Sequence, residues 1–225
     1  MNELNRKAIG GLVNLLLCVA LLIFLPAWTL RYWQGWVFLL AFFGPALGIT
    51  LYLMKNDPQL LERRVKSGSM AEKRRSQKVI QGFAAMAFAA MIALPVLDHR
   101  FRWSAVPVFA VVAGDGLVVL GFLLVFLVFK ENTFTSGTIE VAAEQKVIST
   151  GPYAIVRHPM YVGALVLLLG MPLALGSYWG LLTILAMTAV IVWRLLDEEK
   201  FLVEHLAGYS EYRERVRYRL APFVW

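Results

Sequence analysis

Residues 106–129 read VPVFAVVAGDGLVVLGFLLVFLVF, an apolar run whose one charged residue is Asp115, between two glycines. A helix needs about 20 mostly apolar residues to cross the hydrocarbon core of a bilayer, and this run is long enough. Further apolar runs lie on both sides of it, at residues 8–28, 36–54, 79–97, 159–175 and 179–196. We therefore predict an all-α, polytopic integral membrane protein with five or six transmembrane helices. The run at 159–175 is short enough to be tilted or only partly inserted.

The composition supports the same class of protein. Of the 225 residues, 59% are hydrophobic and 16% are charged, and the mean hydropathy is +0.65, which excludes an ordinary soluble domain. The single cysteine, Cys18, excludes an intramolecular disulfide and a cysteine metal cluster. The formal charge of +7 comes from basic residues that flank the apolar runs. This placement favours contact with anionic membrane lipids and argues against a nucleic-acid partner.

Basic residues are distributed unequally between the two sides that six spans would define. Two precede the first run, eight lie in residues 55–78, three in residues 130–158 and six in the tail from Arg194. The opposite side receives only Arg31, Arg100 and Arg102 of the 22. By the positive-inside rule, both termini are cytoplasmic, in a bacterial inner membrane or an endoplasmic reticulum membrane.

The chain is expected to form one membrane domain over residues 1–225. Residues 1–129 would be a four-span region, and residues 130–225 a cytoplasmic connector, a helical hairpin turning at 176–178 and a C-terminal helix. The run at 8–28 could instead be a signal peptide, but it exceeds the usual h-region and no clear cleavage site follows it.

A polar motif precedes the predicted hairpin, GPYAIVRHPMY at residues 151–161. Pro159 suits the first position of a helix, which places His158 at the cap. A helix start presents unpaired N–H groups and a positive dipole end, which suit the carboxylate of a cofactor with an amino-acid tail. The alternative is that Arg157 and His158 are interfacial anchors of a membrane helix.

A second polar group follows the last run. Arg194 and Glu198 are four residues apart, so they share one helix face and can point into one site. A snorkelling arginine with a surface ion pair is the alternative. Asp115 is either functional or a structural polar contact, because its glycine neighbours would let another helix approach and hydrogen-bond it. His99, expected in a short external loop, and His205, on the tail helix, are interpreted as structural, and no metal site is expected.

These motifs in combination resemble a known family. Residues 151–163, a hairpin, the Arg194 to Glu199 segment, and Tyr209, Tyr212, Arg213, Val216, Leu220, Pro222 and Phe223 are similar to the isoprenylcysteine carboxyl methyltransferases and related phospholipid methyltransferases. The resemblance covers roughly residues 130–225. It implies S-adenosylmethionine (SAM) as cofactor and a cytoplasm-facing C-terminal cofactor pocket.

The resemblance also implies roles for particular residues. Arg194 would contact the substrate and act in catalysis. SAM would be held by the backbone around Val147 and Ile148 and by Tyr153, His158, Pro159, Met160, Tyr161 and Glu198. Two positions depart from the family pattern. Where the family has a polar residue, often glutamine, this chain has an apolar one near Ala142, and where the family has a histidine this chain has Gln145.

The leading hypothesis is a methyltransferase that modifies a carboxylate or similar group on a lipophilic substrate, either a small molecule or a prenylated or lipidated chain. A carboxylate is ionised at neutral pH, so no strong general base is required. An NADPH-dependent reductase of the sterol-reductase type is a second hypothesis. A non-enzymatic transport or assembly protein is a third. The acceptor and the oligomeric state are not specified by the sequence.

Overall fold

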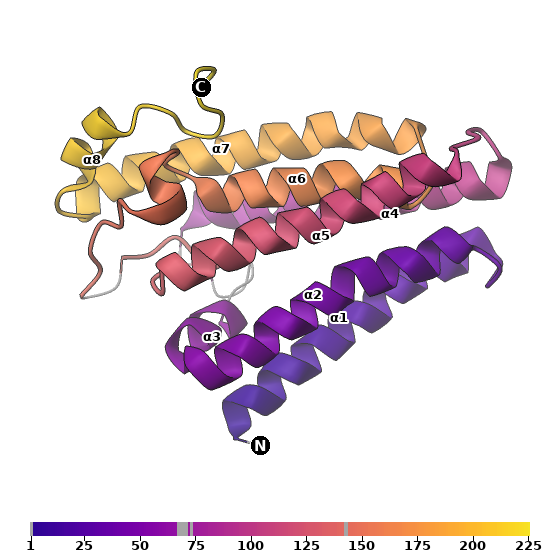
Figure 1. The fold of residues 1–225 in the computed structure, drawn as a ribbon, viewed down its shortest axis with the longest axis horizontal. Helices are drawn as coiled ribbons and strands as arrows, with labels where there is room; N and C mark the ends of the chain where they lie inside the picture. Colours follow the sequence, from indigo (N-terminus) through magenta and orange to yellow (C-terminus); the bar gives the residue numbers. More distant parts are fainter. Residues whose placement is uncertain (1, 67–71, 73, 142–143) are drawn as a thin grey trace.

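The computed structural model describes residues 2–66, 72, 74–141 and 144–225, and the described residues form helices and connecting segments without a strand. The elements are α1 (Glu3–Ala27), α2 (Trp33–Asn56), α3 (Pro58–Val65), α4 (Arg75–Phe101), α5 (Val108–Glu131), η1 (Gly151–Ala154), α6 (Pro159–Ala174), η2 (Trp179–Leu181), α7 (Leu182–His205) and α8 (Tyr209–Arg215). The predicted all-α class is confirmed (Figure 1).

Five helical segments in the described part of the chain are long and apolar enough to span a membrane. They are α1, α2, α4, α5 and the segment Trp179–His205. The sixth apolar helix, α6, has only 16 residues and rises about 24 Å at 1.5 Å per residue, less than the roughly 30 Å of a hydrocarbon core. The surface of the bundle exposes large apolar side chains, including Leu40, Phe109 and Leu185, as lipid contact requires.

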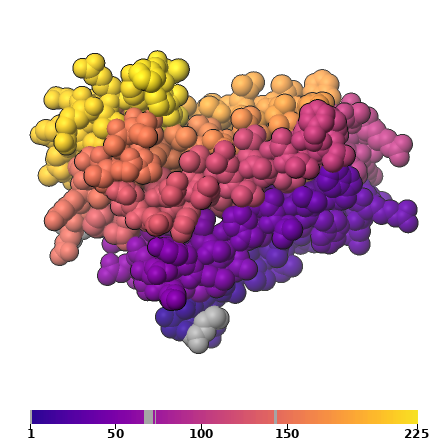
Figure 2. Space-filling model, viewed as in Figure 1, coloured from indigo at the N-terminus to yellow at the C-terminus, as the bar shows by residue number. Residues whose placement is uncertain are grey.

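The helices form a layer of α4 to α7 against which the α1–α2 hairpin packs (Figure 1). Val19 and Ile23 of α1, Met91 and Ile92 of α4, and Met171 of α6 meet in the main apolar core. One end of the bundle carries α3, α8 and the connector between α5 and α6. In Figure 2 the C-terminal residues, in yellow, cover this end together with the orange connector.

Glycines set the close contact between α5 and α6. A Cβ atom at Gly121 would lie 2.5 Å from the Leu167 Cβ and 2.7 Å from the Gly163 carbonyl oxygen, so only glycine permits this approach. The hairpin turn after α6 forms at Gly176 (φ +71°), where Gly176 N–H donates to Leu173 O at 2.8 Å. This turn lies where the sequence predicted it.

The structure adds detail that the apolar runs did not define. Helix α3 occupies part of the basic 55–78 segment, and α7 continues past the apolar run at 179–196 to His205. Helix α5 runs unbroken through Asp115 and its glycines. His99 lies in the last turn of α4 rather than in a loop, because α4 continues until Arg102 takes a left-handed conformation (φ 57°).

Candidate cofactor and substrate cavity

A cavity of about 640 Å³ opens at the bundle end that carries α3 and α8. Its wall combines the start of α6, the second half of α7 and the α5–α6 connector. The structure brings all nine residues singled out in the sequence to this wall: Val147, Ile148, Tyr153, His158, Pro159, Met160, Tyr161, Arg194 and Glu198. Gln145 also lines the cavity, whereas Ala142 lies outside the described residues.

The start of α6 has the predicted form, with Pro159 as its first residue and His158 as its N-cap. No side chain caps the helix. In the described part of the chain, the Met160 N–H has no backbone acceptor. An unpaired donor is therefore present where the motif faces the cavity.

Arg194 and Glu198 share a face of α7, as their spacing predicted, and a tyrosine joins them. The Tyr161 hydroxyl donates to Glu198 Oε2 at 2.5 Å and accepts from Arg194 Nε at 3.1 Å. The side chains of Arg194 and Glu198 are only partly exposed, so the alternative of a snorkelling arginine with a surface ion pair does not describe Arg194. A cation, a phenol and a carboxylate therefore form one polar row in the cavity.

Contacts from distant segments fix the Arg194 guanidinium. Its Nη1 donates to Gln77 Oε1 at 3.0 Å and its Nη2 to Gly137 O at 2.8 Å. Gln77 is fully buried in α4 and its amide donates to Asp197 on α7. Sequence reasoning missed Gln77, because a single glutamine at the start of an apolar helix carries no distinctive pattern.

Glu199, the neighbour of Glu198, faces away from this row into a buried cluster and is only 4% exposed. Its Oε1 accepts from Arg157 Nε at 2.7 Å and lies 3.3 Å from His158 Nε2, and its Oε2 accepts from Arg219 Nε at 2.8 Å. The two glutamates thus have different surroundings, which their adjacency in the sequence did not reveal.

The same cluster attaches the C-terminal tail to the motif before α6. Arg157 N–H donates to Tyr218 O at 2.9 Å, and His158 N–H donates to Arg219 O at 3.1 Å. The Arg157 guanidinium also donates to the Val216 carbonyl oxygen at 2.8 Å. Arg157 is therefore a structural clamp in this structure, and the interfacial-anchor interpretation does not describe it.

Tyr153 lies on the rim of the cavity, held from both sides. Asn132 donates to its hydroxyl at 2.9 Å, and the Tyr212 hydroxyl donates to its carbonyl oxygen at 2.8 Å. Burial raises the pKa of Tyr153 to about 12, and the hydrogen bond from Asn132 lowers the pKa by a smaller amount than burial raises it. Its phenol therefore stays neutral at physiological pH.

The deeper part of the cavity is apolar. Side chains from four helices line it: Phe42, Ile80, Ala84, Phe122, Leu167 and Leu168. Arg64 of α3 also lines the cavity, and its guanidinium lies 5.2 Å from the centre of the Phe129 ring. Burial lowers the pKa of Arg64, and the positive charge of Arg194 lowers it further, so two arginines face the same space.

Three other polar residues lie apart from this cavity. Asp115 is buried in α5, and neither carboxylate oxygen has a hydrogen-bond partner among the described residues. Gly114 does let α6 approach, but among the described residues no hydrogen bond to Asp115 forms, so the structural polar contact, one of its two interpretations, is not seen. His99 stacks on Tyr32 with ring centres 3.9 Å apart, and His205 Nδ1 lies 2.8 Å from Phe201 O at the end of α7. Within the described residues, no group of three or more His, Cys, Asp or Glu side chains could hold a metal ion.

The fold and the cavity define a polytopic helical membrane protein with a chamber that is polar near one membrane face and apolar toward the core. Residues 109–208 match the model of the phospholipid methyltransferase family, which confirms the resemblance to membrane methyltransferases. The chain is also 33% identical over 91 residues to a Delta(14)-sterol reductase from Mus musculus. That similarity covers 39% of this chain, and the chain spans only about a fifth (22%) of the relative's length.

Proposed function

We propose that this protein is a SAM-dependent membrane methyltransferase that modifies an anionic group, such as a carboxylate, on a lipophilic substrate. The observation that carries the proposal is the arrangement of Arg194, Tyr161 and Glu198 in one row, between a motif suited to a cofactor and an apolar inner wall. The family match over residues 109–208 supports the reaction class.

The residues present fit SAM. Glu198 is an acceptor suited to ribose hydroxyls or to the cofactor's amine, and the free Met160 N–H and the positive end of α6 suit its carboxylate. A volume of about 640 Å³ lies within the range of small-molecule sites. Bound SAM would supply an electrophilic methyl group on a sulfonium centre.

The chain's own residues would orient the acceptor and exclude water. Arg194 and Arg64 supply positive charge in one cavity, which favours an anionic acceptor over an amine headgroup that must first lose a proton. The wall of Phe42, Phe122 and Leu167 offers an apolar surface to a lipid-like tail. Orientation of two reactants supplies roughly 7–11 kcal/mol in well-aligned cases, which suits a site without a strong base.

Cofactor binding is the first test of this proposal. Calorimetric titration of the detergent-purified protein with S-adenosylhomocysteine should show saturable binding that Glu198→Ala weakens while membrane insertion is unchanged. Glu204→Ala is the matched control, since Glu204 lies on the same helix with its side chain 71% exposed. Unaltered affinity in Glu198→Ala would remove Glu198 from the site.

Acceptor use is the second test. Arg194→Ala should raise KM or lower kcat/KM for the acceptor by roughly 10-fold to 100-fold, the cost of a lost hydrogen bond to a charged group, while S-adenosylhomocysteine affinity changes little. Lys200→Ala, at an exposed position of α7, is the control. Identical kinetics in Arg194→Ala and the control would exclude a role for Arg194 in acceptor binding.

A second candidate is an NADPH-dependent reductase, which the similarity to the sterol reductase favours. A reductase needs cationic groups for the nucleotide's 2′-phosphate. Arg157, in the motif before α6, is engaged by Glu199, whereas Arg64 and Arg194 line the cavity. The same titration with NADPH therefore separates the two candidates. Binding of NADPH without S-adenosylhomocysteine would favour the reductase, and binding of neither by folded protein would favour a non-enzymatic role.

A further inference from the structure

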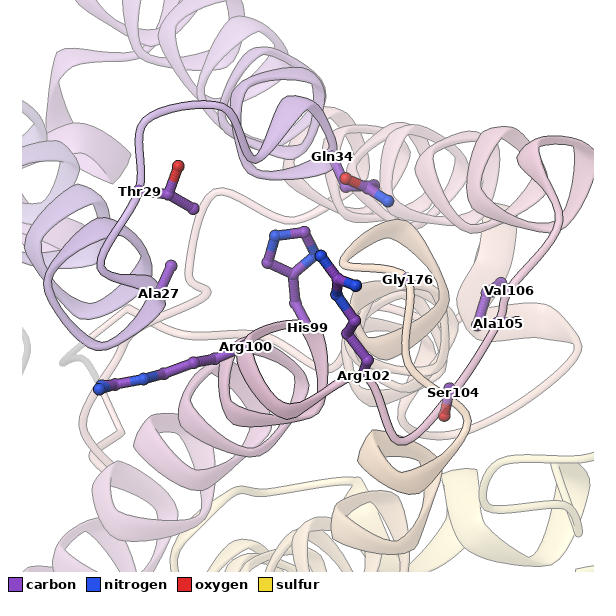
Figure 3. Close-up of a pocket in the computed structure, with 10 residues that line it drawn as sticks. All are labelled: Ala27, Thr29, Gln34, His99, Arg100, Arg102, Ser104, Ala105, Val106 and Gly176. Atoms are coloured by element: carbon purple, nitrogen blue, oxygen red, sulfur yellow. The ribbon is translucent and has the colours of Figure 1, made fainter.

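A second cavity, of about 390 Å³, lies at the opposite end of the bundle from the proposed cofactor site, and Figure 3 shows its lining residues in close-up. It is bounded by the α1–α2 turn, the end of α4 with the segment after it, and the α6–η2 turn, and it is open to the outside. Its lining residues are Ala27, Thr29, Gln34, His99, Arg100, Arg102, Ser104, Ala105, Val106 and Gly176. The charge asymmetry of the chain predicts that this end faces away from the cytosol.

Positive charge dominates this second cavity. Two of the three arginines expected on this side, Arg100 and Arg102, line it, and none of its described lining residues is acidic. The nearby Asp98 is fully buried, and its carboxylate oxygens accept hydrogen bonds from the Ser104 N–H, the Ser104 hydroxyl and the Ser177 hydroxyl. Asp98 is therefore already engaged and does not line the cavity.

Arg100 and Arg102 differ in their partners. Arg100 Nη1 donates to Pro26 O at 3.2 Å, and its guanidinium lies 5.5 Å from the Trp28 ring centre. Within the described part of the chain, the Arg102 guanidinium has no hydrogen-bond or ion-pair partner. In Figure 3 it extends over the cavity toward Gln34 and His99, while Arg100 points away.

The backbone at Arg102 makes this arginine unusual. It takes φ 57° and ψ 44° at the end of α4, a left-handed conformation that favours glycine. An arginine there accepts conformational strain without gaining a hydrogen bond or ion pair among the described residues, and its charge instead acts on the neighbouring His99. Strain of this kind at a cavity is commonly associated with a functional side chain.

Gln34 provides a second sign of a ligand. Its Oε1 atom is buried without a hydrogen-bond partner among the described residues. Because that oxygen is inaccessible to water, the group that Gln34 offers to the cavity is the donor at the other end of the amide, Nε2. Gln34 also lies in the first turn of α2, whose N-cap residue Tyr32 makes no side-chain capping bond. The positive end of the α2 dipole therefore adjoins the cavity.

Exposed aromatic residues place the cavity at headgroup depth. Trp28, Trp36, Trp103 and Trp179 are each more than half exposed and surround this end of the bundle. Tryptophan gathers at the membrane–water interface, where lipid phosphates lie. A ligand entering from the bilayer would therefore present a phosphate at this level.

We propose that this cavity binds a phosphate group, supplied by the phosphodiester of a membrane phospholipid, with Arg102 as the charged contact and Gln34 and Thr29 as hydrogen-bonding contacts. The bound lipid would join the outer ends of the α1–α2 hairpin, α4 and the α6–η2 turn. This site is separate from the cofactor cavity, so it stands or falls independently of the methyltransferase proposal.

The test is native mass spectrometry of the intact, detergent-purified protein titrated with short-chain phosphatidylglycerol. Diacylglycerol with the same acyl chains serves as the phosphate-free probe. Arg102→Gly removes the guanidinium and suits the left-handed backbone, so it should fold at least as well as the wild type. Arg31→Ala is the matched control, because Arg31 is exposed on the same side but does not line the cavity.

The wild type and Arg31→Ala should bind phosphatidylglycerol at least roughly tenfold more tightly than Arg102→Gly, and diacylglycerol should bind all three weakly. Displacement of the lipid by millimolar inorganic phosphate would support the phosphate site and identify the free anion as a competing occupant. Equal lipid affinity in Arg102→Gly and the wild type, or diacylglycerol binding as tight as that of phosphatidylglycerol, would overturn the proposal.

Discussion

Replacing Glu199 by glutamine tests the buried cluster that holds the C-terminal tail. The change keeps the size of the side chain but removes the negative charge shared by Arg157, His158 and Arg219. Removing one partner of a buried ion pair costs about 3–5 kcal/mol. The Arg157 side chain is 6% exposed but that of Arg219 is 30% exposed, so its share is screened and we expect the lower end, about 3 kcal/mol.

The assay is thermal unfolding in detergent followed by circular dichroism. A loss of about 3 kcal/mol corresponds to a decrease in Tm of roughly 6–12 °C for a chain of this size. Limited proteolysis should also cleave the tail after residue 215 faster in Glu199→Gln, since the anchoring bonds of Arg157 depend on the carboxylate.

Glu198→Gln is the matched control for this prediction. Glu198 is adjacent in the chain but contacts Tyr161 in the cavity. Its replacement should therefore cost no more than about 1 kcal/mol of stability and lower Tm correspondingly less. An unchanged Tm in Glu199→Gln, or a larger decrease in Glu198→Gln, would refute the division of roles between the two glutamates.

Two further predictions concern packing and pH. Gly121→Ala should destabilise the protein by about 1–3 kcal/mol, because the added methyl overlaps α6. Gly116→Ala is the control and should be tolerated, because nothing lies within 4 Å of its Cβ position. Equal unfolding temperatures in the two variants would contradict the close α5–α6 contact. Burial raises the pKa of Tyr153 from 10 to about 12, so the folded protein holds the phenol proton more tightly than the unfolded chain does. The free energy of unfolding should therefore fall as pH rises from about 10 to 12. The fall should be smaller in Tyr153→Phe, and identical pH profiles would show that Tyr153 does not contribute to it.

Local signals in the sequence predicted much of the fold. The apolar runs predicted the spans, Pro159 predicted the start of α6, and Gly176 predicted the turn after it. Helix α3 was missed because eight residues are too few for a reliable helical period, and its apolar positions belong to a strongly basic segment.

The sequence predicted which residues meet on the wall of the candidate cavity, but it did not predict their hydrogen-bond partners. The spacing of Arg194 and Glu198 placed both on one face, yet the partner of Arg194, Gln77, lies 117 residues away in the chain. Which of two adjacent glutamates enters the cavity depends on how α7 is rotated about its axis. That rotation is fixed by packing against α4 and α6, which no local pattern records.

The attachment of Tyr218 and Arg219 to the motif before α6 also determines when the cavity can form during biosynthesis. The helices α2, α4, α5 and α6, which supply much of the cavity wall, end well before Tyr218 in the chain, so they can be inserted while Tyr218 and Arg219 are still inside the ribosome. Their carbonyl groups are then absent from Arg157 and His158, and Glu199 lacks Arg219. The order of synthesis thus separates membrane insertion from completion of the cavity, and a nascent chain would reach the bilayer before residues 157 and 158 acquired these tail contacts.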